Sequence, residues 1–173
     1  MIIAGFCGVG KTTFANSHQN VIDLHVMPYK YINLNEVNNN YNDESIKADP
    51  ELILNPDWRY NYYNKLISLY KSEPNKIIVI PTDIQIMNWL ECDEIPFTLV
   101  FPSYELKEEY RNRYLKRENT AAFIDIFINN WDYWIGMFKQ QKECKKIELK
   151  TSEYLSDVIS FKGGIPALWS FFA

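Results

Sequence analysis

MIIAGFCGVGKTT, residues 1–13, combines an apolar run with a glycine-rich segment and a Lys-Thr-Thr ending. This order predicts a short buried strand, a tight turn and a helix, in the pattern G-x-x-x-x-G-K-[ST] of a phosphate-binding loop. Gly5, Gly8 and Gly10 would let the loop curl until successive N–H groups point at a phosphate. The positive end of the following helix would strengthen that attraction.

The side chains of this loop predict the ligand. Lys11 would lie along the β and γ phosphates, and the Thr12 hydroxyl would coordinate Mg²⁺. The predicted nucleotide site consists of Gly5, Gly8, Val9, Gly10, Lys11, Thr12 and Thr13. The alternative is a glycine-rich turn with an incidental Lys-Thr pair, and it is disfavoured because a β-branched strand precedes the motif and a helix-compatible stretch follows. The expected ligand is a nucleoside triphosphate.

Length and composition exclude several classes of protein. A chain of 173 residues suits one domain, and a net charge of −4 argues against general affinity for nucleic acid. Three widely spaced cysteines fit no zinc or disulfide framework, which is typical of a reducing cytoplasm. No stretch reaches the roughly 18 apolar residues of a membrane span. We expect a cytoplasmic domain without a membrane segment.

Apolar periodicity predicts an α/β domain. The β-branched run at 76–80 is typical of a buried parallel strand. Further strands are expected at 21–24, 96–102 and 145–150, and helices at 12–17, 56–70, 84–90, 103–118 and 119–141, with a brief helix after a Ser152 cap. The asparagine-rich part of residues 27–72 should leave the sheet. The apolar tail, residues 163–173, should dock on the domain or on a partner subunit in a homodimer.

Two candidate site residues follow the second expected strand. Asp23 and His25 should face the phosphate loop, because side chains at the carboxyl ends of parallel strands meet at one edge of the sheet. The alternatives are that Asp23 caps a helix or turn and that His25 is a structural histidine.

Asp83 and Arg59 are candidates with strong structural alternatives. Asp83 follows the strand at 76–80, where a magnesium-side acid would lie, but it could equally cap the next helix. Arg59 could present a cation to a bound anion, or it could be a solvated first-turn arginine.

Three of the four arginines, Arg111, Arg113 and Arg117, lie in one helical segment. Arg113 and Arg117 share a helix face, so both could reach one anion. The alternative is an i, i+4 pair between Glu109 and Arg113. The concentration of bidentate cations in a chain otherwise rich in lysine favours phosphate binding.

Together these features resemble the small P-loop kinases of nucleotides, nucleosides and metabolites, among them bacterial and phage proteins of that group. The specific match is residues 5–13. Weaker matches are residues 22–25, the aromatic helix at Trp58 and residues 106–110, which lead into the arginines. The resemblance implies an α/β fold with a three-layer parallel sheet in the order 2-3-1-4-5 and helices on both faces.

The resemblance also implies an activity, the transfer of the γ-phosphoryl group of ATP with Mg²⁺ to a nucleoside or nucleotide. Asp23 would bind or deprotonate the acceptor, residues 27–72 would form an acceptor lid, and the arginines would belong to a second lid at 103–120. The chain departs from the family pattern by placing His25 where several members have a second acid, and by lacking D-G-x-P-R after Ile80.

Other activities use the same motif. A nucleotide-binding regulator or weak NTPase is the main rival. A GTPase is disfavoured because no N-K-x-D sequence is present, and polynucleotide end-phosphorylation is disfavoured by the acidic charge.

Overall fold

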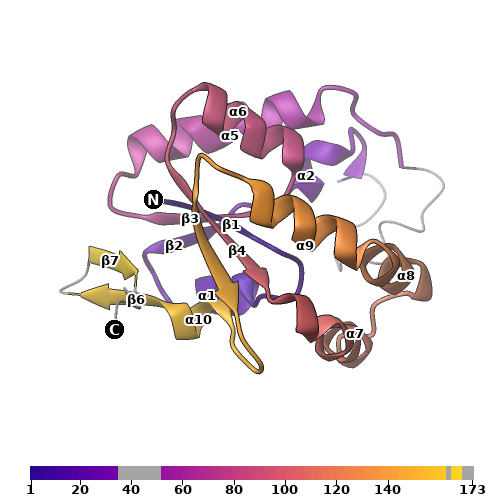
Figure 1. The fold of residues 1–173 in the computed structure, drawn as a ribbon. Helices are drawn as coiled ribbons and strands as arrows, with labels where there is room; N and C mark the ends of the chain where they lie inside the picture. Colours follow the sequence, from indigo (N-terminus) through magenta and orange to yellow (C-terminus); the bar gives the residue numbers. More distant parts are fainter. Residues whose placement is uncertain (35–51, 163–164, 169–173) are drawn as a thin grey trace.

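Figure 1 shows a computed structural model in which residues 1–34, 52–162 and 165–168 are described. Five strands form an all-parallel sheet in the order β2-β3-β1-β4-β5, as the sequence predicted. Their bounds are β1 Ile2–Gly5, β2 Val21–Asp23, β3 Ile77–Pro81, β4 Phe97–Pro102 and β5 Lys145–Leu149. In the centre of the sheet, Ile3 of β1 lies opposite Val79 of β3 and Thr98 of β4. The two neighbours of β1 therefore frame the segment that follows it.

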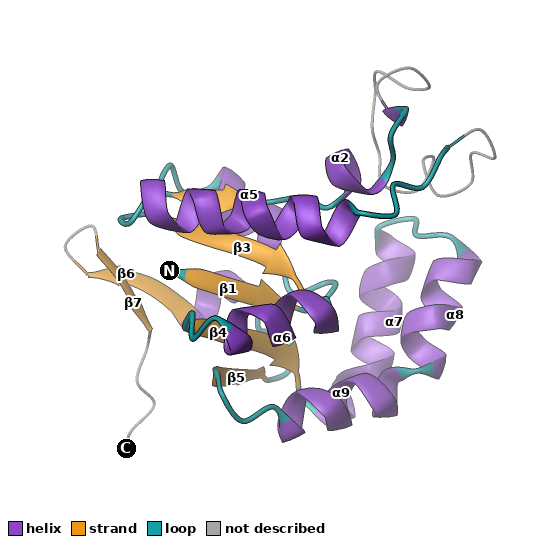
Figure 2. Cartoon of the chain, turned by 90° about the horizontal axis from the view of Figure 1, so that it is seen from above, coloured by secondary structure: helices purple, strands orange, loops and turns teal. Residues whose placement is uncertain are grey.

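Helices cover both faces of this sheet. Their bounds are α1 Lys11–Asn16, α2 Met27–Lys30, α5 Trp58–Ser72, α6 Ile84–Cys92, α7 Lys107–Lys116, α8 Ala121–Asn129, α9 Trp131–Gln140 and α10 Leu155–Val158, with a 3₁₀ turn at Tyr104–Leu106. In Figure 1, α5, α6 and α9 lie on one side of the sheet and α1 and α10 on the other. Figure 2 shows α2, α7 and α8 beyond the tips of the central strands, where a parallel sheet binds ligands.

An aromatic cluster joins the end of β1 to the helices at 107–140. Phe6 is 1% exposed, and its ring makes edge-on contacts with Phe127, Trp131 and Phe138 at centroid distances of 5.5–5.8 Å. The ring of Tyr110 lies 6.2 Å from that of Phe6. Aromatic pairs in this geometry stabilise beyond the burial of their area. The cluster therefore fixes α7, α8 and α9 next to the glycine-rich loop between β1 and α1.

The prediction of a single helix at 119–141 is wrong, because two helices meet at Asn130. The Asn130 side chain donates from Nδ2 to the Ile126 carbonyl at 2.8 Å, a local bond that competes with helix continuation. Helix α8 lies beside α7 at the strand tips, whereas α9 runs back over the sheet (Figure 2). The break lets both Ile128 and Ile135 be buried at 0–1% exposure.

The prediction that Ser152 caps the brief last helix is also wrong. Helix α10 begins after Tyr154, whose N–H donates to the Asp157 carboxylate at 2.7 Å. Ser152 lies in the preceding turn at a φ of 63°. The Glu109 carboxylate accepts the Ser152 N–H at 3.1 Å and thereby supports this turn.

The expected excursion and tail are described only in part. Helix α5 confirms the helix predicted at 56–70, whereas residues 35–51 lie outside the described residues. In the tail, β6 (Ile159–Lys162) pairs with β7 (Ile165–Leu168) in an antiparallel two-stranded sheet. The other tail residues, 163–164 and 169–173, are not described, so docking on a partner subunit stays a prediction. No helix in the described part of the chain is long and apolar enough to cross a membrane.

Candidate functional site

The loop that the sequence predicts to bind phosphate, hereafter the phosphate loop, runs from the end of β1 to the start of α1. Gly8 and Gly10 both have positive φ angles, 89° and 90°. A Cβ atom on Gly8 would lie 3.1 Å from the Tyr114 ring and 3.2 Å from the Tyr110 ring. The loop therefore has the curled backbone that its sequence predicted, and it needs glycine at these positions both for conformation and for space.

Three consecutive carbonyl groups of the loop accept hydrogen bonds from the surrounding protein. The Tyr114 hydroxyl donates to Cys7 O at 3.0 Å, Arg113 Nη1 donates to Gly8 O at 3.1 Å, and the Leu155 N–H donates to Val9 O at 2.9 Å. Burial raises the pKa of Tyr114, so this phenol keeps the proton that it donates. The outer side of the loop is therefore held by α7 and by the start of α10.

Lys11 is the first residue of α1, and its side chain folds back onto the loop. Its Nζ atom donates to Gly5 O at 2.8 Å and to Phe6 O at 3.1 Å. Both acceptors are neutral carbonyls, so the ammonium group can exchange them for phosphate oxygens of higher charge.

Asp23 lies opposite the loop and contacts two candidate residues. Its Oδ2 atom accepts a hydrogen bond from the Thr12 hydroxyl at 2.7 Å and lies 3.3 Å from His25 Nε2. The Asp23 side chain is 9% exposed, and that of His25 is 51% exposed. The alternative that Asp23 caps a turn has no support in its contacts. The structure brings Thr12, Asp23 and His25 into one hydrogen-bonding group.

Helix α5 fixes the segment that carries Asp23 and His25. The Tyr62 hydroxyl donates to the Leu24 carbonyl between them at 2.8 Å. Burial, and then the nearby Asp23 charge, raise the pKa of Tyr62, which keeps it a neutral donor. Tyr62 therefore joins the segment after β2 to α5.

These residues line a cavity of about 1150 Å³ at the strand tips. Five cationic side chains and two acidic ones border it: Lys11, Lys30, Arg113, Lys116 and Arg117, with Asp23 and Glu109. Pockets for a single small ligand hold roughly 300–1,000 Å³. The volume and charge of the cavity suit a polyphosphate together with a second small molecule.

Sequence reasoning missed the aromatic part of the cavity. Phe123 and Phe127 of α8 and Trp134 of α9 line it, although all three fit the apolar stripe of the single helix that was expected. Helical spacing cannot separate a core aromatic from a cavity aromatic, because both occupy the same stripe. A flat apolar surface of this kind can pack against a ring.

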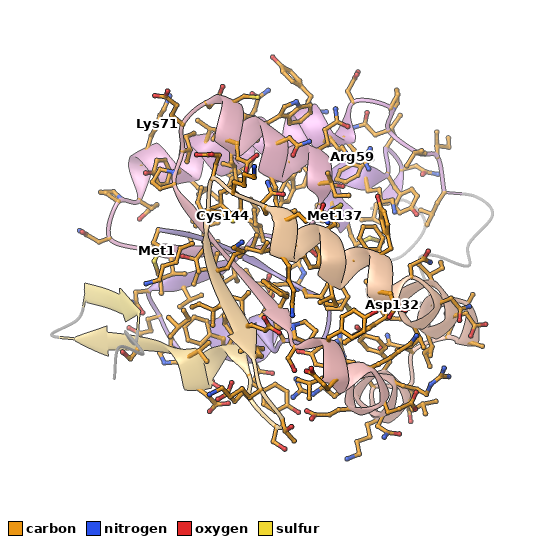
Figure 3. The ribbon with its side chains drawn as sticks, viewed as in Figure 1. Met1, Arg59, Lys71, Asp132, Met137 and Cys144 are labelled. Carbon is orange, nitrogen blue, oxygen red and sulfur yellow. The ribbon has the colours of Figure 1, made fainter. Side chains whose placement is uncertain are left out.

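Neither Asp83 nor Arg59 lines this cavity, although Pro81 and Thr82, directly before Asp83, do. The Asp83 carboxylate caps α6 by accepting the Gln85 and Ile86 N–H groups, each at 3.1 Å. It also pairs with Arg59 Nε at 3.0 Å, and Figure 3 shows Arg59 on the α5 side of the molecule. The helix-cap alternative is therefore the observed one for Asp83, and Arg59 serves this ion pair.

The three arginines of the expected lid have different surroundings. Arg111 Nε lies 3.6 Å from Glu108 Oε2, and Arg111 does not line the cavity. Arg113 lines the cavity, but it is 8% exposed and bonded to Glu109, the alternative partner, as well as to the loop. Arg117 lines the cavity and forms no ion pair with any residue that the structure describes. Arg117 is therefore the arginine suited to contact a ligand.

The oxygen groups near Thr12 fit Mg²⁺. The described residues contain no group of three or more His, Cys, Asp or Glu side chains that could hold a metal. Mg²⁺ commonly needs only one or two protein ligands beside phosphate oxygens and water, and the Thr12 hydroxyl next to Asp23 supplies such groups. Asp23, and not Asp83, is the carboxylate brought to Thr12.

Comparison with protein-family models finds no family that matches this chain, and comparison with curated proteins finds no match. The chemistry of the site is therefore inferred from its own residues. A curled loop, cationic side chains and a strand-tip carboxylate around one cavity can bind a polyphosphate and place a second molecule beside its last phosphate.

Proposed function

We propose that this protein transfers the γ-phosphoryl group of ATP to a hydroxyl or phosphate group of a small acceptor, with nucleosides and nucleotides as the first candidates. The observation that carries the proposal is the Thr12–Asp23 hydrogen bond of 2.7 Å, which joins a phosphate-loop sequence to an acid at the tip of β2. Such an acid suits a loop that holds Mg²⁺ with a triphosphate, and its second oxygen, Oδ1, would remain for an acceptor. The resemblance to P-loop kinases supports the same activity.

The loop and the cations would bind the triphosphate. Backbone N–H groups of residues 8–13 would surround the β phosphate, and Lys11 would reach the γ phosphate from its place at the Gly5 carbonyl. Arg117, at the end of α7, would contact the transferred group. Charge that develops on the phosphoryl oxygens would then be stabilised by groups already in place.

Thr12 would bind Mg²⁺, which neutralises phosphate charge when it is present. The hydrogen bond to Asp23 directs the Thr12 hydroxyl proton toward the carboxylate and leaves the oxygen lone pairs for the metal. Asp23 thus orients the metal-binding hydroxyl.

Asp23 would also align the acceptor. Because its Oδ2 atom already accepts from Thr12, an acceptor hydroxyl would use Oδ1. His25 borders the same part of the cavity and offers a second polar contact. The rings of Phe123, Phe127 and Trp134 would pack against a nucleobase, which is why nucleosides and nucleotides come first.

A nucleotide-binding regulator or weak NTPase is the second candidate, and one observation favours it. Asp23 is already engaged by Thr12 and His25, so its carboxylate could serve only to orient the Thr12 hydroxyl. Either activity fits the cytoplasm, where nucleoside triphosphates are available and the thiols of the chain would remain reduced.

A transfer screen separates the two candidates. ATP and Mg²⁺ are incubated with nucleosides, nucleoside monophosphates and small hydroxylated metabolites, and hydrolysis is followed in parallel. A kinase gives phosphorylated product that depends on Asp23, so Asp23→Asn loses transfer, whereas the matched control Asp125→Asn, at an exposed position on α8, keeps it. ATP binding without transfer to any acceptor, and without an effect of Asp23→Asn, would support the regulator.

A further inference from the structure

Arg113 is the charged member of a set of donors on the outer side of the phosphate loop. Gly8 O, the carbonyl that it holds, lies between Cys7 O, held by the Tyr114 hydroxyl, and Val9 O, held by the Leu155 N–H. The donors come from α7 and α10, 105 and more residues further along the chain. Because donors from distant parts of the chain bind three consecutive carbonyls, tertiary contacts determine the backbone conformation on this side of the loop.

Four of the five N–H groups of the Arg113 guanidinium donate to described protein oxygens, one of them from Nη1 to Gly8 O. Its Nε atom donates to Glu109 Oε1 at 3.1 Å, and its Nη2 atom donates to that oxygen and, at 2.9 Å, to Glu153 O. The planar group lies 3.9 Å from the ring centroid of Tyr154 and 4.6 Å from that of Tyr110. With 8% exposure, moving this cation toward a ligand would break several buried contacts and leave Glu109 unpaired.

The same contacts join α7 to the turn before α10. Glu109 accepts from Arg113 and also from the Ser152 N–H at 3.1 Å. The Tyr154 ring packs against the loop, because a Cβ on Gly10 would lie 3.2 Å from it. The middle of α7, the turn and the phosphate loop therefore form one packed unit. This arrangement is unlike a lid, which must separate from the loop to open.

Peptide geometry gives these contacts a consequence for binding. In a trans peptide the C=O bond and the next N–H bond point in opposite directions. Holding the carbonyls of Cys7 and Val9 toward α7 and α10 therefore turns the N–H groups of Gly8 and Gly10 to the opposite side, whereas the Val9 N–H donates to Phe6 O at 3.4 Å. The Gly8 carbonyl lies between these two peptides, so Arg113 fixes the backbone that joins them. Groups that are aimed before the ligand arrives need no reorganisation at binding.

We propose that Arg113 is a positioning residue that fixes the phosphate loop in its binding conformation through the Gly8 carbonyl, and that it does not contact the phosphates. The inference rests on the proposed function, because it treats the loop as a polyphosphate site. It replaces the role in a closing lid that the sequence predicted for Arg113. The ligand would then be contacted by Lys116 and Arg117, which border the cavity at the C-terminal end of α7.

The test compares two arginines of one helix. Arg113→Met keeps length and removes the hydrogen bonds to Gly8 O, Glu109 and Glu153 O. Arg111→Met is the matched control, since Arg111 is an α7 arginine that does not line the cavity. ATP and pyrophosphate affinities are measured by calorimetry at a temperature where circular dichroism shows both variants fully folded, and melting temperatures are recorded separately.

We expect Arg113→Met to bind both probes about tenfold to a hundredfold more weakly, in line with the loss of a buried charge-assisted hydrogen bond. Arg111→Met should stay within about twofold of wild type, because exposed ion pairs contribute little. Arg113→Ala should recover part of its pyrophosphate affinity when millimolar methylguanidinium is added. A lower melting temperature with unchanged affinity for both probes would overturn the inference and leave Arg113 as a structural residue.

If Arg113→Met does not fold, Tyr114→Phe tests the same set of donors, since it removes only the hydroxyl that donates to Cys7 O. We expect a two- to tenfold loss of pyrophosphate affinity, and an unchanged affinity in this variant would count against the inference.

Different outcomes of the binding and transfer assays would reject the proposed function. Arg113-dependent binding without transfer to any acceptor would reject the kinase and keep the positioning role, whereas absence of binding by wild type would reject both.

Discussion

The packing of the phosphate loop against α7 predicts a large difference between two Gly→Ala substitutions. At Gly8, a φ of 89° costs a side chain about 1–2 kcal/mol. The new methyl group would also lie 3.1 Å from the Tyr114 ring and 3.2 Å from the Tyr110 ring, and both tyrosines are 0% exposed. Overpacking against rings that cannot move aside costs about 1–3 kcal/mol. Gly8→Ala should therefore destabilise the fold by about 2–5 kcal/mol.

Gly136 provides the matched control. It lies inside α9, and a Cβ there meets no atom within 4 Å. Gly136→Ala should stabilise the protein by about 0.5–1 kcal/mol, because alanine loses less conformational entropy in a helix. Urea denaturation followed by circular dichroism measures both variants. A free energy of unfolding for Gly8→Ala within about 1 kcal/mol of the wild-type value, or a Gly136→Ala variant less stable than Gly8→Ala, would contradict this prediction.

Three further predictions concern single side chains. Asp23→Asn should fold and bind ATP and Mg²⁺ near wild-type strength but lose about a hundredfold in transfer, and a proportionate loss of stability would instead mark a structural carboxylate. Arg117→Ala should lower turnover more than ATP affinity and leave the melting temperature unchanged, with equal turnover in variant and wild type as the contrary result. Burial raises the pKa of the Cys144 thiol to about 11, so the thiolate is scarce at pH 8 and alkylation by iodoacetamide should be slower than that of free cysteine by on the order of a hundredfold. Mass spectrometry would follow the alkylation of Cys144, and rapid alkylation at pH 8 would contradict the prediction.

The features that sequence predicted well are local ones. Residues 77–80 are β-branched, continuous and buried, so their strand needs no information from elsewhere in the chain. The spacing of Gly8 and Gly10 likewise predicted a backbone that only glycine adopts readily, and the φ angles agree. The parallel order 2-3-1-4-5 followed from the resemblance that these elements supported.

The features that sequence predicted poorly depend on contacts between distant residues. Arg113 and Arg117 share a helix face, yet one is held by Gly8, 105 residues away, and the other borders the cavity. Spacing along a helix cannot decide which of two neighbours is paired. Asp83 gave two equally good interpretations, and the structure shows the local cap of α6, together with an ion pair from Arg59 of a different helix that no local pattern predicts.

The change of chain direction at Asn130 also could not be predicted from apolar periodicity. Apolar residues continue at helical spacing through it, so periodicity alone predicts one helix. The break arises because α8 must stay beside α7 while α9 must return over β4. This requirement comes from tertiary packing. The resulting arrangement of α8 and α9 also places Phe123, Phe127 and Trp134 at the cavity.

Titration of ATP into wild type and Lys11→Ala, with and without Mg²⁺, distinguishes a nucleotide site from a glycine-rich turn with an incidental lysine. Lys11 is held at the loop by the carbonyls of Gly5 and Phe6, ready to move to the phosphates. We expect wild type to bind ATP, Mg²⁺ to strengthen the binding, and Lys11→Ala to bind at least about tenfold more weakly while remaining folded. Equal ATP affinity in wild type and Lys11→Ala, or no ATP binding by wild type, would contradict the assignment of a nucleotide site.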